Sequence, residues 1–145
     1  MSYALSRVMS TATASYAVYA LSNPEHLGQA VDAGKHEQEG YDLLAQVFGV
    51  RDLAVSTFGV LGRGRTVRTA MWIRIACDVG DGLLLAARAE DDEVRAKVLG
   101  VTMTWGALNL VALTLDRRRA AKVEAAKKVG SAAGTVVSKV ADKVT

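Results

Sequence analysis

The chain has 145 residues and a formal net charge of +3, and half of its residues are apolar although only 6% are aromatic. With one proline and no sustained strand-like alternation, the sequence predicts one all-α domain. A single cysteine, Cys77, excludes an intramolecular disulfide, and two histidines argue against a dedicated zinc site.

The first predicted helix is a run of 17 uncharged residues from Val8 to Pro24. Its serines and threonines make it a marginal membrane span. A secretory signal with Arg7 as its basic region is the alternative, but the apolar part lacks the leucine-rich run that signals prefer. We therefore expect a helix that ends near Asn23-Pro24.

Residues 25–42 carry five carboxylates against one lysine, which predicts a polar connecting loop with room for a short surface helix. The potential metal ligands in it are His26, His36, Glu37 and Glu39. Because they follow no recognisable ligand spacing, we interpret them as solvated loop residues and expect no metal and no cofactor.

A second apolar stretch runs from Leu43 to Leu61, with Arg51-Asp52 at its midpoint. Within it, Gln46, Asp52 and Ser56 are predicted to share one helical face. The turn that follows contains Arg63, Arg65 and Arg68 and no acidic residue.

The third stretch, Met71 to Ala87, is apolar but contains Arg74, Asp78 and Asp81. A spacing of four and then three residues places these three on one stripe of a helix. In water the stripe would face solvent, whereas in a bilayer it must face other helices, a cavity or an opposite charge.

The fourth stretch has 18 uncharged residues from Val98 to Leu115 and a single amide, Asn109. Gly100 and Gly106 are expected to allow close approach of another helix. The stretch ends at Asp116, before the triplet Arg117, Arg118 and Arg119. We expect a four-helix membrane domain over 1–116 and a basic cytoplasmic tail over 117–145.

The tail is rich in alanine, valine and lysine, with apolar residues at alternating steps of three and four. We expect it to lie on the membrane surface or to pair with a partner helix. Disorder is the alternative.

Basic segments alternate with acidic ones along the chain, as four crossings with both termini in the cytoplasm would require. We therefore predict a four-helix transmembrane bundle in the plasma or inner membrane, with a soluble helical bundle as the alternative. Six residues are predicted to contact anionic headgroups on the cytoplasmic side: Arg63, Arg65, Arg68, Arg117, Arg118 and Arg119.

Six residues are predicted to form a polar network inside the membrane: Arg51, Asp52, Arg74, Asp78, Asp81 and Asn109. Two interpretations stay open: a functional one, as a proton or ion relay or a polar pocket, and a structural network that fixes helix packing and register. We favour the structural network, because two bases and three acids nearly cancel.

A resemblance rests on two segments, Val47-Phe48-Gly49-Val50-Arg51-Asp52-Leu53-Ala54 and Cys77-Asp78-Val79-Gly80-Asp81-Gly82-Leu83-Leu84. With its FGxRD-like second helix and Asp-rich third helix, the chain resembles a bacterial family of small four-helix integral membrane proteins of unknown function. The resemblance covers about residues 4 to 116. It implies a fold and a membrane location but no activity or cofactor.

No serine is matched to a histidine on a predicted helix and no phosphate-binding loop is present, so no enzymatic activity is expected. We predict an accessory or assembly subunit that meets a protein partner through helix faces or the tail. A small transporter or proton-handling protein is the alternative. The basic residues predict no specific nucleic acid.

Overall fold

The computed structural model describes residues 3–144, with side chains from Tyr3 to Ser131. Within this part the chain is all-helical and has no strand, so the all-α prediction is confirmed for the described residues. The helices are α1 (Ala4–Ser22), α2 (His26–Ala30), α3 (Gln38–Leu61), α4 (Arg65–Arg88) and α5 (Asp92–Val144).

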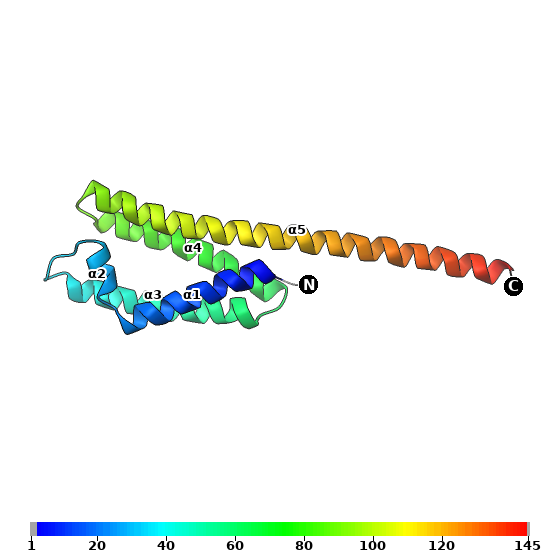
Figure 1. The fold of residues 1–145 in the computed structure, drawn as a ribbon, viewed down its shortest axis with the longest axis horizontal. Coiled ribbons are helices and arrows are strands. Elements are labelled where there is room, and N and C mark those ends of the chain that lie inside the picture. Colours follow the sequence, from blue (N-terminus) through cyan, green and yellow to red (C-terminus); the bar gives the residue numbers. More distant parts are fainter. Residues whose placement is uncertain (1–2, 145) are drawn as a thin grey trace.

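The long helices form two antiparallel pairs, α1 with α3 and α4 with α5, and the two pairs pack into one bundle (Figure 1). The short helix α2 packs on α3 at one end of the bundle. At the opposite end α5 continues far beyond the other helices, and the N-terminus lies near the point where α5 leaves them.

Helix α5 runs without interruption through the expected boundary between residues 116 and 117. The sequence beyond Asp116 is rich in alanine, lysine and arginine, all strong helix formers, and its first glycine is Gly130. The tail therefore continues the fourth predicted helix, and residues 117–131 are called the α5 extension below. The seam positions from Ala133 onward have side chains outside the described residues.

Local sequence explains where the helices end. Pro24 follows the last turn of α1 and cannot continue its hydrogen bonds. Gly64 precedes α4 with a φ of +50°, a backbone conformation that favours glycine. Asp91 precedes α5 and caps its N-terminus, because its carboxylate accepts hydrogen bonds from the backbone N–H groups of Glu93 and Val94 at 2.6 and 3.4 Å.

Small residues allow α1 and α3 to approach closely. The buried face of α1 consists of Ser6, Ser10, Thr13, Ala17 and Ala20. A Cβ atom added to Gly49 of α3 would lie 2.8 Å from Leu21 Cγ, and one added to Gly59 would lie 2.8 Å from Ser10 Cβ. Such small-residue seams are typical of helix pairs in membranes.

The two glycines of the fourth predicted helix differ in their surroundings. Gly106 faces Asp78, whose Cβ would lie 3.3 Å from an added Cβ, so the expected close approach is confirmed there. Gly100 has nothing within 4 Å, so the same expectation is wrong for Gly100, because this position faces away from the other helices.

The interior of the bundle is apolar at its two ends and polar between them. One apolar cluster, at the α2 end, includes Leu27, Tyr41, Leu85 and Val94. The other, near the N-terminus, comprises Tyr3, Val67, Met71, Ala112 and Leu113. Charged and amide side chains fill the layer between these clusters: Asp52, Arg74, Asp78 and Asn109 are all buried.

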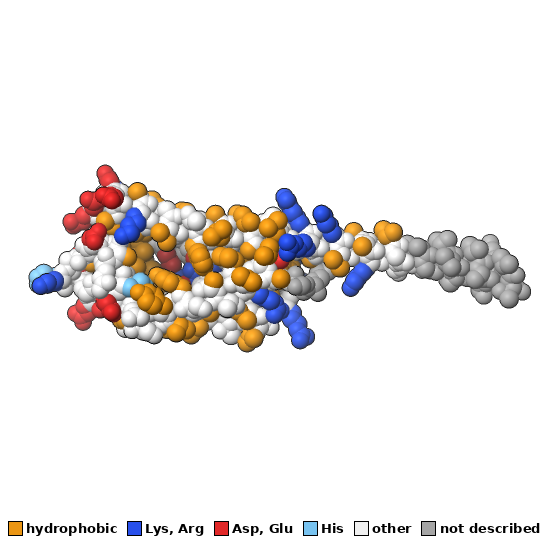
Figure 2. Space-filling view, in the orientation of Figure 1, with side chains coloured by type: hydrophobic (Ala, Val, Ile, Leu, Met, Phe, Trp, Pro, Cys, Tyr) orange, Lys and Arg blue, Asp and Glu red, His pale blue; other side chains and the backbone are white. Residues whose placement is uncertain are grey.

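The outer surface of the bundle shows the opposite distribution. Figure 2 shows hydrophobic side chains over the middle of the bundle, acidic side chains gathered at one end and basic ones towards the other. Large apolar side chains that are more than half exposed include Val47, Val50, Phe58, Leu83, Val101 and Val111.

Two helices of the described part are long and apolar enough to cross a membrane, α3 and the segment Asp92–Ser131 of α5. Only 28% of the apolar window in each is buried inside the bundle, whereas the core helix of a water-soluble protein is mostly buried. This composition and exposure support a membrane location.

Candidate functional site

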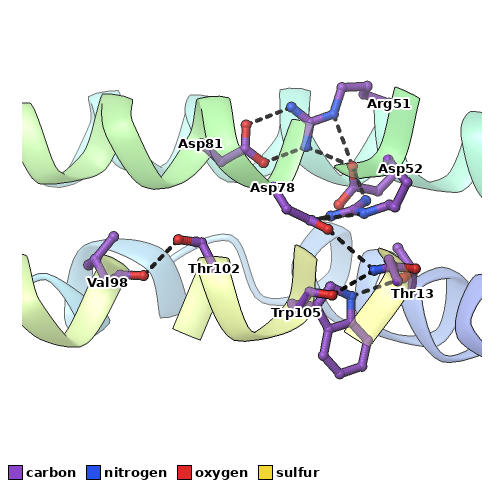
Figure 3. A network of polar contacts seen from close by, with 10 residues as sticks. Thr13, Arg51, Asp52, Asp78, Asp81, Val98, Thr102 and Trp105 are labelled. Carbon is purple, nitrogen blue, oxygen red and sulfur yellow. Dashed lines mark hydrogen bonds and ion pairs between the residues drawn. The ribbon is translucent and has the colours of Figure 1, made fainter. Parts of the chain in front are cut away.

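Two arginines and three aspartates meet between α3 and α4 (Figure 3). Arg51 of α3 binds Asp81 of α4 through two parallel hydrogen bonds, Nη1 to Oδ1 at 2.7 Å and Nη2 to Oδ2 at 2.6 Å. Its Nε and Nη2 atoms also donate to Oδ1 of Asp52 at 2.9 and 2.7 Å. Because two-point pairing fixes orientation, Arg51 sets the position of α4 against α3.

Arg74 of α4 makes the second set of ion pairs and lies deeper, with its side chain 9% exposed against 28% for Arg51. Its Nε and Nη2 atoms donate to Oδ1 of Asp78, one turn along α4, at 2.9 and 2.5 Å. Its Nη1 atom lies 2.5 Å from Asp52 Oδ1. This contact is an ion pair and does not have the geometry of a hydrogen bond. Arg74 therefore links the buried carboxylate of its own helix to that of α3.

Asn109 extends the network to α5 and α1. Its side-chain amide donates to Asp78 Oδ2 at 3.3 Å and to the carbonyl oxygen of Trp105 at 3.0 Å. The indole N–H of Trp105 in turn donates to Thr13 Oγ1 of α1 at 3.2 Å (Figure 3). One connected set of polar contacts thus joins all four long helices.

The structure brings together all six residues predicted for the polar network, namely Arg51, Asp52, Arg74, Asp78, Asp81 and Asn109. Gln46 is exposed and does not share the buried face of Asp52 and Ser56, so that expectation is wrong. Gln46 precedes Asp52 by six residues, which is about 1.7 turns and places the two on different sides of the helix.

The network carries one more carboxylate than guanidinium groups. All arginine contacts to Asp52 use Oδ1, which leaves its Oδ2 atom outside these bonds. Separately, two buried atoms that no ion pair reaches, Ser56 Oγ and Asn109 Oδ1, have no hydrogen-bond partner in the described structure. Since buried polar atoms are normally paired, these atoms are spare hydrogen-bonding capacity at the centre of the bundle.

A cavity of about 280 Å³ adjoins the network. Its charged wall consists of Asp52, Arg74, Asp78 and Asp81, and Tyr16, Phe48 and Trp105 supply aromatic walls. Figure 2 shows a hollow on the face of the bundle between α5 and α1. The charged residues are therefore next to a space of small-molecule size and are not sealed by packing on every side.

Tyr16 and His26 connect α1 and α2 beside this cavity. His26 Nδ1 lies 2.6 Å from the carbonyl oxygen of Asn23 and so must donate to it. In neutral His26, Nε2 then accepts the hydroxyl proton of Tyr16, at 2.8 Å. The interpretation of His26 as a solvated loop residue is wrong, because it is half-buried in this pair.

The other residues considered as metal ligands, His36, Glu37 and Glu39, are exposed. Across the described residues, no group of three or more His, Cys, Asp and Glu side chains is placed to hold a metal ion.

The six predicted surface arginines lie at one end of the bundle. Arg63, Arg65 and Arg68 surround the turn between α3 and α4, and Arg117, Arg118 and Arg119 lie on α5 where it leaves the bundle. All are exposed except Arg68, which is half-buried, and within the described part of the chain none forms an ion pair.

Asp116 is a buried site residue that sequence reasoning treated only as the end of a helix. It is fully buried and accepts hydrogen bonds from Ser6 N at 2.8 Å, Ser6 Oγ at 2.9 Å and Leu5 N at 3.4 Å. It therefore caps the N-terminus of α1, where Tyr3 supplies no side-chain cap. A lone acid between an uncharged run and three arginines was the available signal.

Comparison with models of protein families, with curated proteins and with solved structures finds no match to this chain. The resemblance carried by the Arg51-Asp52 and Asp78–Asp81 segments stays a prediction.

Proposed function

We propose that the chain is an integral membrane protein whose four long helices cross the bilayer. The observation that carries this proposal is the reversed distribution of side chains, with Arg74 and Asp78 buried and Val50 and Leu83 exposed at the middle of the bundle. In hydrocarbon, exposed aliphatic groups carry no penalty, whereas ionised groups must turn towards one another.

The helix lengths fit this proposal. Helices α3 and α4 have 24 residues each, or about 36 Å, against a hydrocarbon core of about 30 Å. Alone, α4 would insert poorly, because a central charge costs about 2.5 to 3.5 kcal/mol. Its contacts with Arg51 and Asp52 of α3 supply the opposite charges that α4 needs.

Hydroxyl groups on the outer face are also consistent with hydrocarbon. Thr11, Ser15 and Thr57 are exposed, and each donates a hydrogen bond to the carbonyl oxygen four residues earlier, at 3.0, 3.1 and 2.8 Å. Within a bilayer such internal bonds replace the missing water.

The charge difference between the two ends of the bundle supports one orientation of the protein in the membrane. Basic residues near membrane spans prefer the cytoplasm, so the end with Arg63 and Arg118 would face inward. Both termini and the α5 extension would then be cytoplasmic, and α2 would lie outside.

Alkaline carbonate extraction tests the membrane assignment. The full chain should stay in the membrane pellet, and a reporter fused to either terminus should be active only in the cytoplasm. Release into the supernatant would contradict the assignment and favour a soluble bundle.

Within the membrane we propose an accessory or assembly role, in which the α5 extension meets a protein partner. The supporting observation is that residues 117–131 leave the bundle and nearly all are exposed. Lysine cross-linking in native membranes should join Lys127 or Lys128 to another protein, whereas Lys97 at the opposite end is the matched control. Cross-links confined to this chain would contradict the role.

A second candidate function is transport or handling of protons or small cations. It is supported by the surplus carboxylate and by the cavity that reaches Asp52 and Asp81. Purified protein in proteoliposomes should then conduct protons, and Asp52→Asn, Asp78→Asn or Asp81→Asn should lower the flux relative to Asp92→Asn. Asp92 is a suitable control because its side chain is 92% exposed. Equal flux in all four variants would reject this function.

A further inference from the structure

A second cavity, of about 330 Å³, lies between α3 and α4 near the basic end of the bundle. Its apolar wall is formed by Val55 and Phe58 of α3 and by Ala70 and Ile73 of α4. Phe58 is 62% exposed and Ile73 46% exposed. The cavity is therefore an apolar groove at the outer surface of the bundle, and it is called the α3–α4 groove below.

One end of the α3–α4 groove is polar. Arg65, the first residue of α4, lines it together with Thr66 and Thr69. All three are exposed, and among the described residues Arg65 has no acidic partner. Thr66 and Thr69 do not donate to the carbonyl four residues earlier, unlike Thr11 and Thr57, so their hydroxyl groups stay available.

The order of these residues along α4 matches the shape of a phospholipid. Arg65, Thr69 and Ile73 lie on one row and span two turns, or about 12 Å. In the proposed topology Arg65 is at the cytoplasmic headgroup level and Ile73 points into the hydrocarbon region. A ligand in the groove would thus meet positive charge and hydroxyl groups first and apolar side chains deeper.

We propose that the α3–α4 groove binds one anionic phospholipid of the cytoplasmic leaflet. The phosphate contacts Arg65 and the hydroxyl groups of Thr66 and Thr69, and one acyl chain lies along Phe58 and Ile73. This inference rests on the proposed membrane topology.

Charge complementarity selects an anionic lipid. Two more arginines, Arg63 and Arg68, lie within three residues of Arg65, and residues 62–68 contain no acid. A basic residue near a headgroup is worth about 1 kcal/mol towards anionic lipid, so Arg65 alone predicts about a fivefold preference over a zwitterionic lipid. Bound lipid would also bridge the two helix pairs, because α3 and α4 belong to different pairs.

Native mass spectrometry of the full chain, titrated with phosphatidylglycerol and with phosphatidylcholine, tests the inference. Wild-type protein should bind phosphatidylglycerol at least about fivefold more tightly, and Arg65→Gln should reduce the preference by about fivefold. Ile73→Trp should weaken binding of both lipids, because it fills the apolar part of the groove. Lys122→Gln, which removes an exposed charge outside the groove, should change neither affinity.

Three outcomes would overturn the inference: no preference in the wild-type protein, an equal loss in Lys122→Gln and Arg65→Gln, or unchanged binding in Ile73→Trp. The second outcome would indicate a diffuse basic surface, and the third would indicate a phosphate contact without an acyl-chain site. Arg65 is exposed, so Arg65→Gln should fold, and circular dichroism checks this. Carbonate extraction of the same samples separates the two proposals, since protein that stays in membranes without a lipid preference contradicts only the groove.

Discussion

The inner and outer faces of the same helices differ most at the middle of the bundle. On α3, Asp52 is 4% exposed, whereas Val50, two residues earlier, is 61% exposed. On α4, Arg74 is buried, and its neighbours Trp72 and Ile73 are half exposed. A protein folded by removing apolar surface from water would show the reverse. The comparison therefore favours hydrocarbon over water as the surroundings of these helices, and substitutions on the inner and outer faces can test it.

The largest effect on stability is expected from a substitution on the inner face, at Arg74. Arg74→Met leaves Asp52 and Asp78 buried without this guanidinium, and breaking a buried pair in this way typically costs about 3 to 5 kcal/mol. Thermal unfolding in detergent should show a large loss of stability. Arg88→Met, at an exposed arginine on the same helix, is the matched control.

Replacing Asp52 and Asp78, the partners of Arg74, by asparagine distinguishes two causes of the stability loss, uncompensated charge and lost packing. If uncompensated charge causes the loss, the triple variant R74M/D52N/D78N should recover most of the stability of the wild-type protein. A triple variant as unstable as R74M would show that the shape of the arginine, and not its charge, holds α4 in place.

The next largest effect is expected on the outer face, at Val50. Val50→Arg places a charge near the centre of α3, which should cost about 2.5 to 3.5 kcal/mol of insertion free energy in a bilayer. In water, a substitution at an exposed position usually changes stability by about 0.5 kcal/mol or less. Leu43→Arg is the control, because Leu43 is as exposed as Val50 but lies near the end of the helix. Equal, small effects at both positions in a membrane insertion assay would refute the lipid-facing assignment.

Substitutions of two glycines by alanine compare a packed helix face, at Gly49, with an open one, at Gly100. Gly49→Ala should destabilise by about 1 to 3 kcal/mol, because the new Cβ would meet Leu21 Cγ at 2.8 Å and the Ala17 carbonyl oxygen at 3.2 Å. Gly100→Ala should stabilise by about 0.5 to 1 kcal/mol, because it meets nothing within 4 Å and alanine favours the helix. Opposite shifts in melting temperature are the expected result. A rise in melting temperature for Gly49→Ala would mean that α1 and α3 do not pack this closely, and a fall for Gly100→Ala would mean that the surroundings of Gly100 are not open.

The smallest expected loss is at Asp116. Asp116→Ala should cost about 0.5 to 2 kcal/mol, because alanine has no side-chain oxygen and the helix cap is lost. Hydrogen exchange should accelerate at the backbone amides of Leu5 and Ser6, which donate hydrogen bonds to this carboxylate. Asp91→Ala, at the cap of α5, should accelerate exchange at Glu93 instead. Unchanged protection at Leu5 and Ser6 would contradict the capping role.

Much of the polar network follows from sequence, because it depends on spacing within single helices. Arg74 and Asp78 are one turn apart, and antiparallel neighbours place Arg51 within reach of Asp81. The helix ends at Pro24 and at the glycine-rich turn also follow from local chemistry.

Other features depend on which helices become neighbours, which spacing does not specify. The contact of Asp116 with Ser6 joins residues 110 positions apart, and it forms only because α1 starts beside α5. The contact of Trp105 with Thr13 is of the same kind. Gly100 and Gly106 look alike in sequence, and only the packing of α4 on α5 distinguishes them.

Spin-label accessibility at residue 50 tests the surrounding solvent most directly. With Cys77 replaced by serine, a label on Val50→Cys in liposomes should collide with oxygen and be shielded from a water-soluble nickel chelate. A label on Arg119→Cys should show the opposite preference. If the nickel chelate reaches residue 50 as readily as residue 119, water and not hydrocarbon surrounds the middle of the bundle, and the account is wrong.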